Sequence, residues 1–140
     1  MRSINILLVE DNEGDILLTT EALEESKIIN KVTVIRDGKA AINFFEALNN
    51  KDEHPDLVLL DVNLPKMSGH EVLNYIKNNE KYKRIPVIML TTSSSEKDIM
   101  QSYNSHVNCY ITKPIDVADF VVAIAKVQDF WINIVSISNK

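Results

Sequence analysis

Residues 57–65 read LVLLDVNLP, and this stretch decides how the rest of the chain is interpreted. Consecutive apolar residues end in a carboxylate, Asp61, and a proline, Pro65, follows shortly after it. An uninterrupted apolar run of this kind is typical of a strand buried on both faces, as in a parallel sheet covered by helices. We therefore expect Asp61 to end a buried strand and the chain to turn away directly afterwards.

Runs typical of strands alternate with runs typical of helices along the whole chain. This alternation predicts right-handed βαβ crossovers and one parallel sheet with helices on both faces. The expected fold class is α/β, a doubly wound (βα)5 sheet in the flavodoxin-like strand order 2-1-3-4-5. The expected helix N-caps are Asp37, Ser95 and Asp116. The expected strands are 4–9, 32–35, 57–60, 86–90 and 107–111, and the expected helices are 15–25, 39–48, 69–78, 95–104 and 116–130.

The composition limits the functions open to the chain. Its 140 residues are 45% hydrophobic and 25% charged, which predicts one domain with one core. The net charge is −5 and the pI about 5.2, so no basic surplus exists to neutralise a nucleic acid. The single cysteine, Cys109, allows no intrachain disulfide. No run resembles a signal peptide or a membrane span, and we expect a cytoplasmic protein without membrane contact.

Acidic residues follow two of the predicted strands at the edge where such sheets bind ligands. Glu10 and Asp11 follow the first strand and Asp61 ends the third, while Thr91 and Lys113 follow the fourth and fifth. Since strands one and three are neighbours in the expected order, the three acids should converge. Their mutual repulsion requires a cation, and Mg²⁺ prefers such oxygen ligands. Together with a lysine and a hydroxyl, these groups compose a phosphoryl-transfer site with an aspartate nucleophile.

These residues resemble the receiver domain of two-component response regulators. The resemblance rests on the Glu10-Asp11 pair, Asp61, the run 64–69 (LPKMSG), Thr91 and Lys113-Pro114, and it covers residues 4 to about 130. Its specificity comes from separate features that occur in the right order at the right strand ends. It implies a stand-alone, phospho-accepting signalling protein.

The resemblance implies a role for each acid. Asp61 is implied as the phosphoacceptor that takes a phosphoryl group from a histidine kinase, with at most slow self-dephosphorylation and no enzymatic turnover. Asp11 and Asp61 are implied as direct Mg²⁺ ligands, and Glu10 as a ligand through water. The backbone carbonyl of Asn63 completes the implied metal site. Glu10, Asp11 and Asn12 can also supply the capping groups of the first helix, and both roles can hold together.

The resemblance also implies a switch. Lys113 pairs with Asp61 and then with a phosphoryl oxygen, and Thr91 hydrogen-bonds the phosphoryl group. Tyr110 then turns inward, and Pro114 follows a cis peptide bond. The face built from the fourth helix, fifth strand and fifth helix changes shape, and a downstream protein or a histidine phosphotransfer protein reads it. We expect Lys113→Ala to leave the melting temperature nearly unchanged or raised and to lose partner binding after phosphorylation.

Two alternatives come from other functional classes. An aspartate-nucleophile phosphatase needs a second acid two positions after the nucleophile, and Asn63 occupies that position. A degenerate receiver that serves only as a protein-docking module is disfavoured by the complete acid set and Lys113. A nucleotide-binding loop is excluded because the chain has only three glycines, Gly14, Gly38 and Gly69, at unsuitable spacing.

The C-terminal segment carries more apolar residues than one domain can cover. We assign residues 1–130 to the receiver domain and 131–140 to an extension of the last helix, with no output domain. Residues 121–137 read VVAIAKVQDFWINIVSI, whereas a surface helix needs one apolar stripe. Large exposed apolar patches are rare on monomers, so we expect a homodimer through this segment. The alternatives are that the tail folds back on its own domain or that a partner protein covers it.

Overall fold

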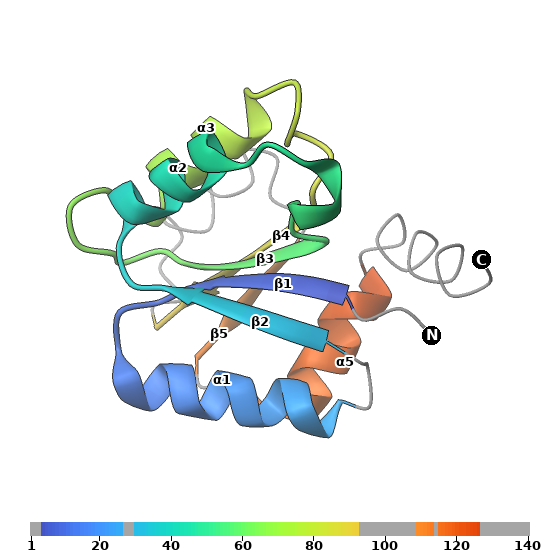
Figure 1. Cartoon of the computed structure of the whole chain (residues 1–140). Coiled ribbons are helices and arrows are strands. Elements are labelled where there is room, and N and C mark those ends of the chain that lie inside the picture. The colour runs from blue at the N-terminus through green and yellow to red at the C-terminus, as the bar shows by residue number, and fades with distance from the viewer. Residues whose placement is uncertain (1–3, 27–29, 93–108, 114, 127–140) are drawn as a thin grey trace.

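The sheet has the predicted topology. The computed structural model describes residues 4–26, 30–92, 109–113 and 115–126, and its five parallel strands follow the order β2-β1-β3-β4-β5 (Figure 1). This confirms the expected flavodoxin-like α/β fold. The strands are β1 (Ile4–Val9), β2 (Asn30–Ile35), β3 (Leu57–Asp61), β4 (Val87–Thr91) and β5 (Cys109–Thr112).

Helices cover both faces of the sheet, α1 and α5 on one and α2 and α3 on the other (Figure 1). Their bounds are α1 (Glu13–Glu25), α2 (Gly38–Ala47), α3 (Gly69–Lys77) and α5 (Val117–Lys126), and a 3₁₀ turn η1 (Lys51–Glu53) lies in the predicted loop before β3. Within the described ranges, no helix is long and apolar enough to cross a membrane. The predicted helix 95–104, its cap Ser95, Pro114 and the segment from residue 127 onward lie outside the described residues.

Side-chain caps set where the helices begin. Asn12 accepts a hydrogen bond from the Asp15 N–H at 2.9 Å, and α1 therefore begins at Glu13, two residues before the predicted start. The predicted caps Asp37 and Asp116 are confirmed: their carboxylates accept from backbone N–H groups three residues on, at 2.7 and 2.8 Å. The first turn of α1 is thus anchored beside the carboxyl end of β1.

The first two strands end at the expected residues, and β3, β4 and β5 each end one residue after the expected apolar run, because backbone pairing continues to that residue. Asp61 ends β3, as expected, where it pairs in register with Leu90, and Thr91 is the last residue of β4. At the other end, β2 begins at Asn30, which pairs with Ile4. Two polar candidates for the site therefore lie inside strands and take their positions from the sheet.

The core consists of two apolar clusters, one on each face of the sheet. Leu57 and Leu59 belong to the cluster on the α1 and α5 face, and Val58 and Leu60 to the cluster on the α2 and α3 face. Successive strand residues point to opposite faces, so Asp61 continues the row of Leu57 and Leu59 toward α1. All five residues of β3 are buried, which holds the Asp61 carboxyl at a defined position.

Candidate functional site

The structure brings the three predicted carboxylates together. Oxygens of Glu10, Asp11 and Asp61 lie within 4.8 Å of one another. The cause is the parallel pairing of β1 with β3, in which Val9 lies opposite Leu60 and the residues that follow each become neighbours. Glu10 and Asp61 are 0% and 2% exposed, whereas Asp11 is exposed to solvent.

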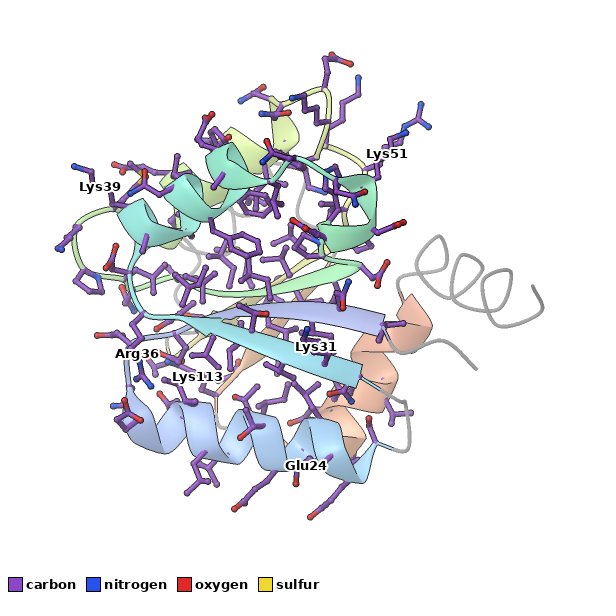
Figure 2. The ribbon with its side chains drawn as sticks, in the orientation of Figure 1. Glu24, Lys31, Arg36, Lys39, Lys51 and Lys113 are labelled. Atoms are coloured by element: carbon purple, nitrogen blue, oxygen red, sulfur yellow. The ribbon has the colours of Figure 1, made fainter. Side chains whose placement is uncertain are left out.

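Lys113, directly after β5, is the cation of this cluster. Its ammonium donates to Glu10 Oε1 at 2.8 Å, to Asp15 Oδ2 at 2.9 Å and to Asp61 Oδ2 at 3.2 Å, and its side chain is 6% exposed. The Lys113 N–H donates to the Thr91 carbonyl at 2.7 Å, so the β4–β5 pairing continues past the strand end. Figure 2 shows Lys113 at the start of α1. One ammonium thus compensates several carboxylates.

Asp15 is a partner of Lys113 that the sequence does not predict. The sequence predicts only that Asp15 begins a helix, yet it forms one of the three ion pairs of Lys113, and its side chain is 24% exposed. No helical spacing indicates this role, because Asp11 precedes the N-cap Asn12 and lies outside α1. The contact itself joins residues 98 positions apart, which no local pattern encodes.

Both oxygens of Glu10 already have partners. Oε1 accepts from Lys113, and Oε2 accepts from the backbone N–H groups of Asp11 at 3.0 Å and Asn12 at 3.3 Å. Glu10 therefore binds the backbone just before α1 and also contributes to the cluster, while the helix N-cap itself is Asn12. Because each Glu10 oxygen already has a partner within the protein, ligation of a metal ion through water fits this arrangement.

The surroundings of Asp61 favour its protonated, uncharged form. Burial and, after it, the adjacent Glu10 carboxyl raise the pKa of Asp61 to about 7. Lys113 and the Asn63 N–H, which donates to Asp61 Oδ1 at 3.2 Å, act in the opposite direction and lower that pKa. Burial lowers the pKa of Lys113, but its carboxylate partners outweigh burial and hold that pKa above its ordinary value. The pocket carries more acids than cations, which suits a divalent cation with oxygen ligands.

The turn after Asp61 requires glycine at two positions that lie close to other backbone atoms. A Cβ atom on Gly69 would lie 2.1 Å from the Asp61 carbonyl oxygen, and one on Gly38 would lie 2.1 Å from the Met67 carbonyl oxygen. Between them, Lys66 has a φ of 67°, and the Met67 N–H donates to the Pro65 carbonyl at 2.8 Å. This tight turn reverses the chain at once. The metal-binding role of the Asn63 carbonyl stays a prediction.

The two predicted switch residues lie in β4 and β5, of which only β4 pairs with β3. Thr91 is 3% exposed at the end of β4, the strand paired with β3. Tyr110 in β5 is half-buried and packs against the apolar cluster on the α2 and α3 face. Both positions agree with the predicted roles, which concern the phosphorylated protein and stay predictions.

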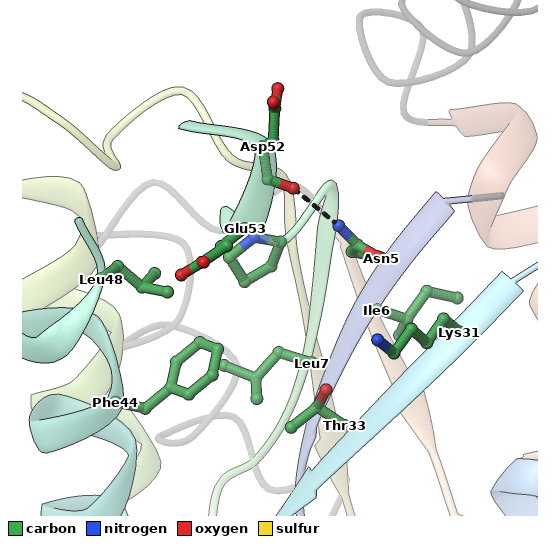
Figure 3. A pocket seen from close by; sticks show the side chains of 10 residues that line it. Asn5, Ile6, Leu7, Lys31, Thr33, Phe44, Leu48, Asp52 and Glu53 are labelled. Carbon is green, nitrogen blue, oxygen red and sulfur yellow. Dashed lines mark hydrogen bonds between the residues drawn. The ribbon is translucent and has the colours of Figure 1, made fainter. Parts of the chain in front are cut away.

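A separate hollow lies at the opposite end of the sheet (Figure 3). It has a volume of about 350 Å³ and opens between the first two strands, the end of α2 and η1, where Asn5 Nδ2 donates to the Asp52 carbonyl at 3.3 Å. It contains none of the predicted site residues. Its lining is Asn5, Ile6, Leu7, Lys31, Thr33, Phe44, Leu48, Asp52, Glu53 and Pro55.

Comparisons with known proteins identify the family. The family model described as "Response regulator receiver domain" matches residues 6–125. Response regulator Rcp1 from Synechocystis sp. is 43% identical over 134 residues, which span 94% of this chain and 91% of that protein. Its Mn(2+)-bound structure has a TM-score of 0.74 at 44% identity and covers 91% of this chain and 94% of that chain. The phosphorylated cyanobacterial phytochrome response regulator RcpA has a TM-score of 0.76 at 43% identity, over 94% of this chain and 95% of that chain.

Family, fold and pocket agree with one another. The family is one of phosphoacceptors rather than catalytic enzymes, which sets aside the phosphatase alternative. The acidic cluster that suits a divalent cation lies at the strand ends, where this fold class binds its ligands. This chain belongs to the response regulator receiver family of two-component signalling.

Proposed function

We propose that Asp61 is the phosphoacceptor of this response regulator. In the proposed step, an Asp61 carboxylate oxygen forms a bond to the phosphorus of a phosphohistidine on a histidine kinase. The N–P bond breaks, and the imidazole takes up a proton. The observation that carries the proposal is the position of Asp61, fixed at the end of a buried strand with Lys113 at 3.2 Å and two further acids beside it. Positioning and charge neutralisation supply most of the catalysis such a transfer needs.

Mg²⁺ is the proposed cofactor. Its proposed ligands are Asp11, Asp61 and the Asn63 carbonyl, with Glu10 acting through water. The three carboxylates within 4.8 Å and their excess of negative charge support this assignment, as does the Mn(2+)-bound form of the related Rcp1. When bound, the cation supplies charge stabilisation for the phosphoryl oxygens.

Phosphorylation is proposed to shift the populations of two conformations. It adds a charge of roughly −1.5 to −2 and three acceptor oxygens to the pocket. Lys113 and the Thr91 hydroxyl bind these oxygens, Tyr110 turns inward, and the face that includes β5 and α5 changes shape. Support comes from the burial of Thr91 on the strand next to Asp61. Reversal is by slow self-dephosphorylation.

The proposed partners are proteins. A histidine kinase supplies the phosphoryl group, and the related phytochrome response regulator RcpA favours a kinase of the phytochrome type. A downstream protein or a histidine phosphotransfer protein reads the switch. The acidic net charge of −5 supports a role without direct nucleic-acid contact. We place the protein in the cytoplasm, without membrane contact.

Residues 131–140 are proposed to extend the last helix and, with α5, to form a homodimer contact. Support comes from Val121 and Val122, which are 50% and 53% exposed on α5, and from the apolar sequence that follows them. The segment from residue 127 lies outside the described residues. A twofold contact would cover these apolar side chains.

Phosphorylation can be tested by intact-protein mass measurement. The protein is incubated with acetyl phosphate and Mg²⁺, and we expect a gain of one phosphoryl group. The gain should disappear in Asp61→Asn and with excess chelator. Asp52→Asn, a matched change at an exposed residue of η1, should leave the gain intact. Phosphorylation that persists in Asp61→Asn would refute the assignment.

A further inference from the structure

Asp15 differs from the other partners of Lys113 in one respect. Glu10 and Asp61 both belong to the carboxylate cluster that can hold a cation, whereas Asp15 does not. Its Oδ2 nevertheless lies 2.9 Å from the Lys113 ammonium, comparable to the 2.8 Å of the Glu10 pair. Asp15 thus remains available to Lys113 when a cation occupies the cluster.

The position of Asp15 is set by the backbone of α1. Its N–H donates to the N-cap Asn12 at 2.9 Å, and it lies in the first turn of the helix. Three quarters of its side chain is covered. Lys113 is fixed just as firmly, through the hydrogen bond from its N–H to the Thr91 carbonyl. The contact between Asp15 and Lys113 is therefore held from both sides.

We infer that Asp15 is a positioning residue that draws the Lys113 ammonium away from Asp61 and Glu10. This inference rests on the proposed function of Asp61. When a divalent cation binds the cluster, Asp15 retains Lys113 and reduces the repulsion between the two cations. When a phosphoryl group is attached to Asp61, Asp15 competes with it for Lys113. The residue therefore favours cation binding and disfavours the phosphorylated form.

The affinities for Mg²⁺ and for a phosphoryl analogue should change in opposite directions when Asp15 is replaced. In Asp15→Asn, Lys113 relaxes toward Glu10 and Asp61, and we expect the Mg²⁺ affinity to fall about twofold to tenfold. At saturating Mg²⁺ we expect the affinity for beryllofluoride, an analogue of the phosphoryl group, to rise by about the same factor. Calorimetric titration measures both affinities. A merely structural loosening of α1 would weaken both.

Glu13→Gln is the matched control. Glu13 lies in the same turn and its replacement removes the same charge, but its side chain is 75% exposed and pairs with Arg36. It should leave both affinities nearly unchanged. In a Lys113→Gln background, Asp15→Asn should lose most of its effect on beryllofluoride, because its action passes through the lysine.

The outcomes separate the two hypotheses. Affinities that stay constant in Asp15→Asn, or that shift in the same direction, overturn the role of Asp15. An effect that survives intact without Lys113 overturns it as well. A wild-type protein that binds Mg²⁺ but not beryllofluoride would instead contradict the proposed function of Asp61, and the Mg²⁺ titrations would still decide whether Asp15 acts through Lys113.

Discussion

Lys113 is the residue on which the pocket depends most. Its single ammonium contacts three carboxylates, of which Glu10 and Asp61 are almost fully buried. Buried charges that lose their partner are costly, because neither water nor another cation replaces it. The three ion pairs therefore give Lys113 a part in stability, contrary to the expectation from the sequence that its replacement leaves the melting temperature nearly unchanged or raised.

Lys113→Ala should destabilise the protein in the absence of divalent cations. We expect the free energy of unfolding to fall by on the order of 3 kcal/mol, since buried carboxylates remain uncompensated. Added Mg²⁺ should restore part of the loss, because it supplies positive charge to the same acids. Urea unfolding with and without Mg²⁺ measures both effects. Lys39→Ala, at an exposed lysine of α2, is the control. A Lys113→Ala variant as stable as the control would contradict the expectation.

Asp61→Asn should stabilise the protein at alkaline pH. The pKa of Asp61 is about 7 in the folded protein and 3.8 for the unperturbed group, so the folded state holds this proton more tightly than the unfolded state. The raised pKa means that the protonated Asp61 contributes to the free energy of unfolding at low pH, and that this contribution is lost as the pH rises through about 7. Asparagine at this position has no proton to lose, so the variant keeps its stability as the pH rises.

The advantage of Asp61→Asn should therefore depend on pH. Without divalent cations, we expect the free energy of unfolding of Asp61→Asn to exceed that of the wild-type protein by about 2–4 kcal/mol at pH values near 8. This difference should shrink steadily as the pH falls toward about 4. Urea unfolding across this range measures it, with the exposed-site variant Asp52→Asn as the control. An advantage that grows on acidification would show that Asp61 is charged rather than neutral in the folded pocket at low pH.

At the scale of elements, the order of strands and helices could be predicted from the sequence, as could the place of Asp61 at the end of its strand. Other ends could not: apolar runs identify which segments are buried, but Thr91 belongs to β4 because the neighbouring strand pairs with it. The convergence of Glu10, Asp11 and Asp61 follows from strand order. The contact of Asp15 with Lys113 depends on how α1 lies against the end of β5, and no periodicity reports that placement.

Gly69→Ala tests how tightly α3 approaches the phosphoacceptor strand. Its Cβ would meet the Asp61 carbonyl oxygen at 2.1 Å and Val62 Cα at 2.9 Å, both backbone atoms that cannot rotate away. We expect a loss of about 2–3 kcal/mol in the free energy of unfolding. Slower phosphorylation should accompany it, because Asp61 must shift.

Gly14→Ala is the matched control for this substitution. Gly14 lies in the first turn of α1, and its nearest contact would be the Asn12 side-chain oxygen at 3.3 Å. That group can adjust, so the free energy of unfolding should change by less than about 1 kcal/mol. If Gly69→Ala lost no more stability than Gly14→Ala, the close approach of α3 to the Asp61 backbone would not be what requires glycine at position 69.

At the scale of the whole molecule, the two ends of the sheet differ in chemistry. The acids and Lys113 gather at the carboxyl ends of the strands, while the hollow of Figure 3 lies at the other end. The exposed valines of α5, Val121 and Val122, belong to neither. These two exposed apolar side chains therefore lie outside both the acidic cluster and the hollow, on the helix that the homodimer proposal involves.

The homodimer proposal can be decided by light scattering across a dilution series. We expect a dimer at protein concentrations on the order of tens of micromolar, which corresponds to a modest free energy of association. Truncation after Gln128 should leave a monomer, since it removes the apolar extension. Replacement of the exposed Leu17 on α1 by Ala is a control that should not change the mass. A monomer at all concentrations, phosphorylated or not, would contradict the proposal.

Chemical mapping of the phosphorylated residue tests the central claim most directly. The protein is phosphorylated by a histidine kinase with Mg²⁺, treated with borohydride to convert aspartyl phosphate to homoserine, digested, and analysed by peptide mass spectrometry. We predict homoserine at position 61 and aspartate at positions 11 and 15. Homoserine at any other acid, or none in a sample whose intact mass includes a phosphoryl group, would contradict the assignment of Asp61.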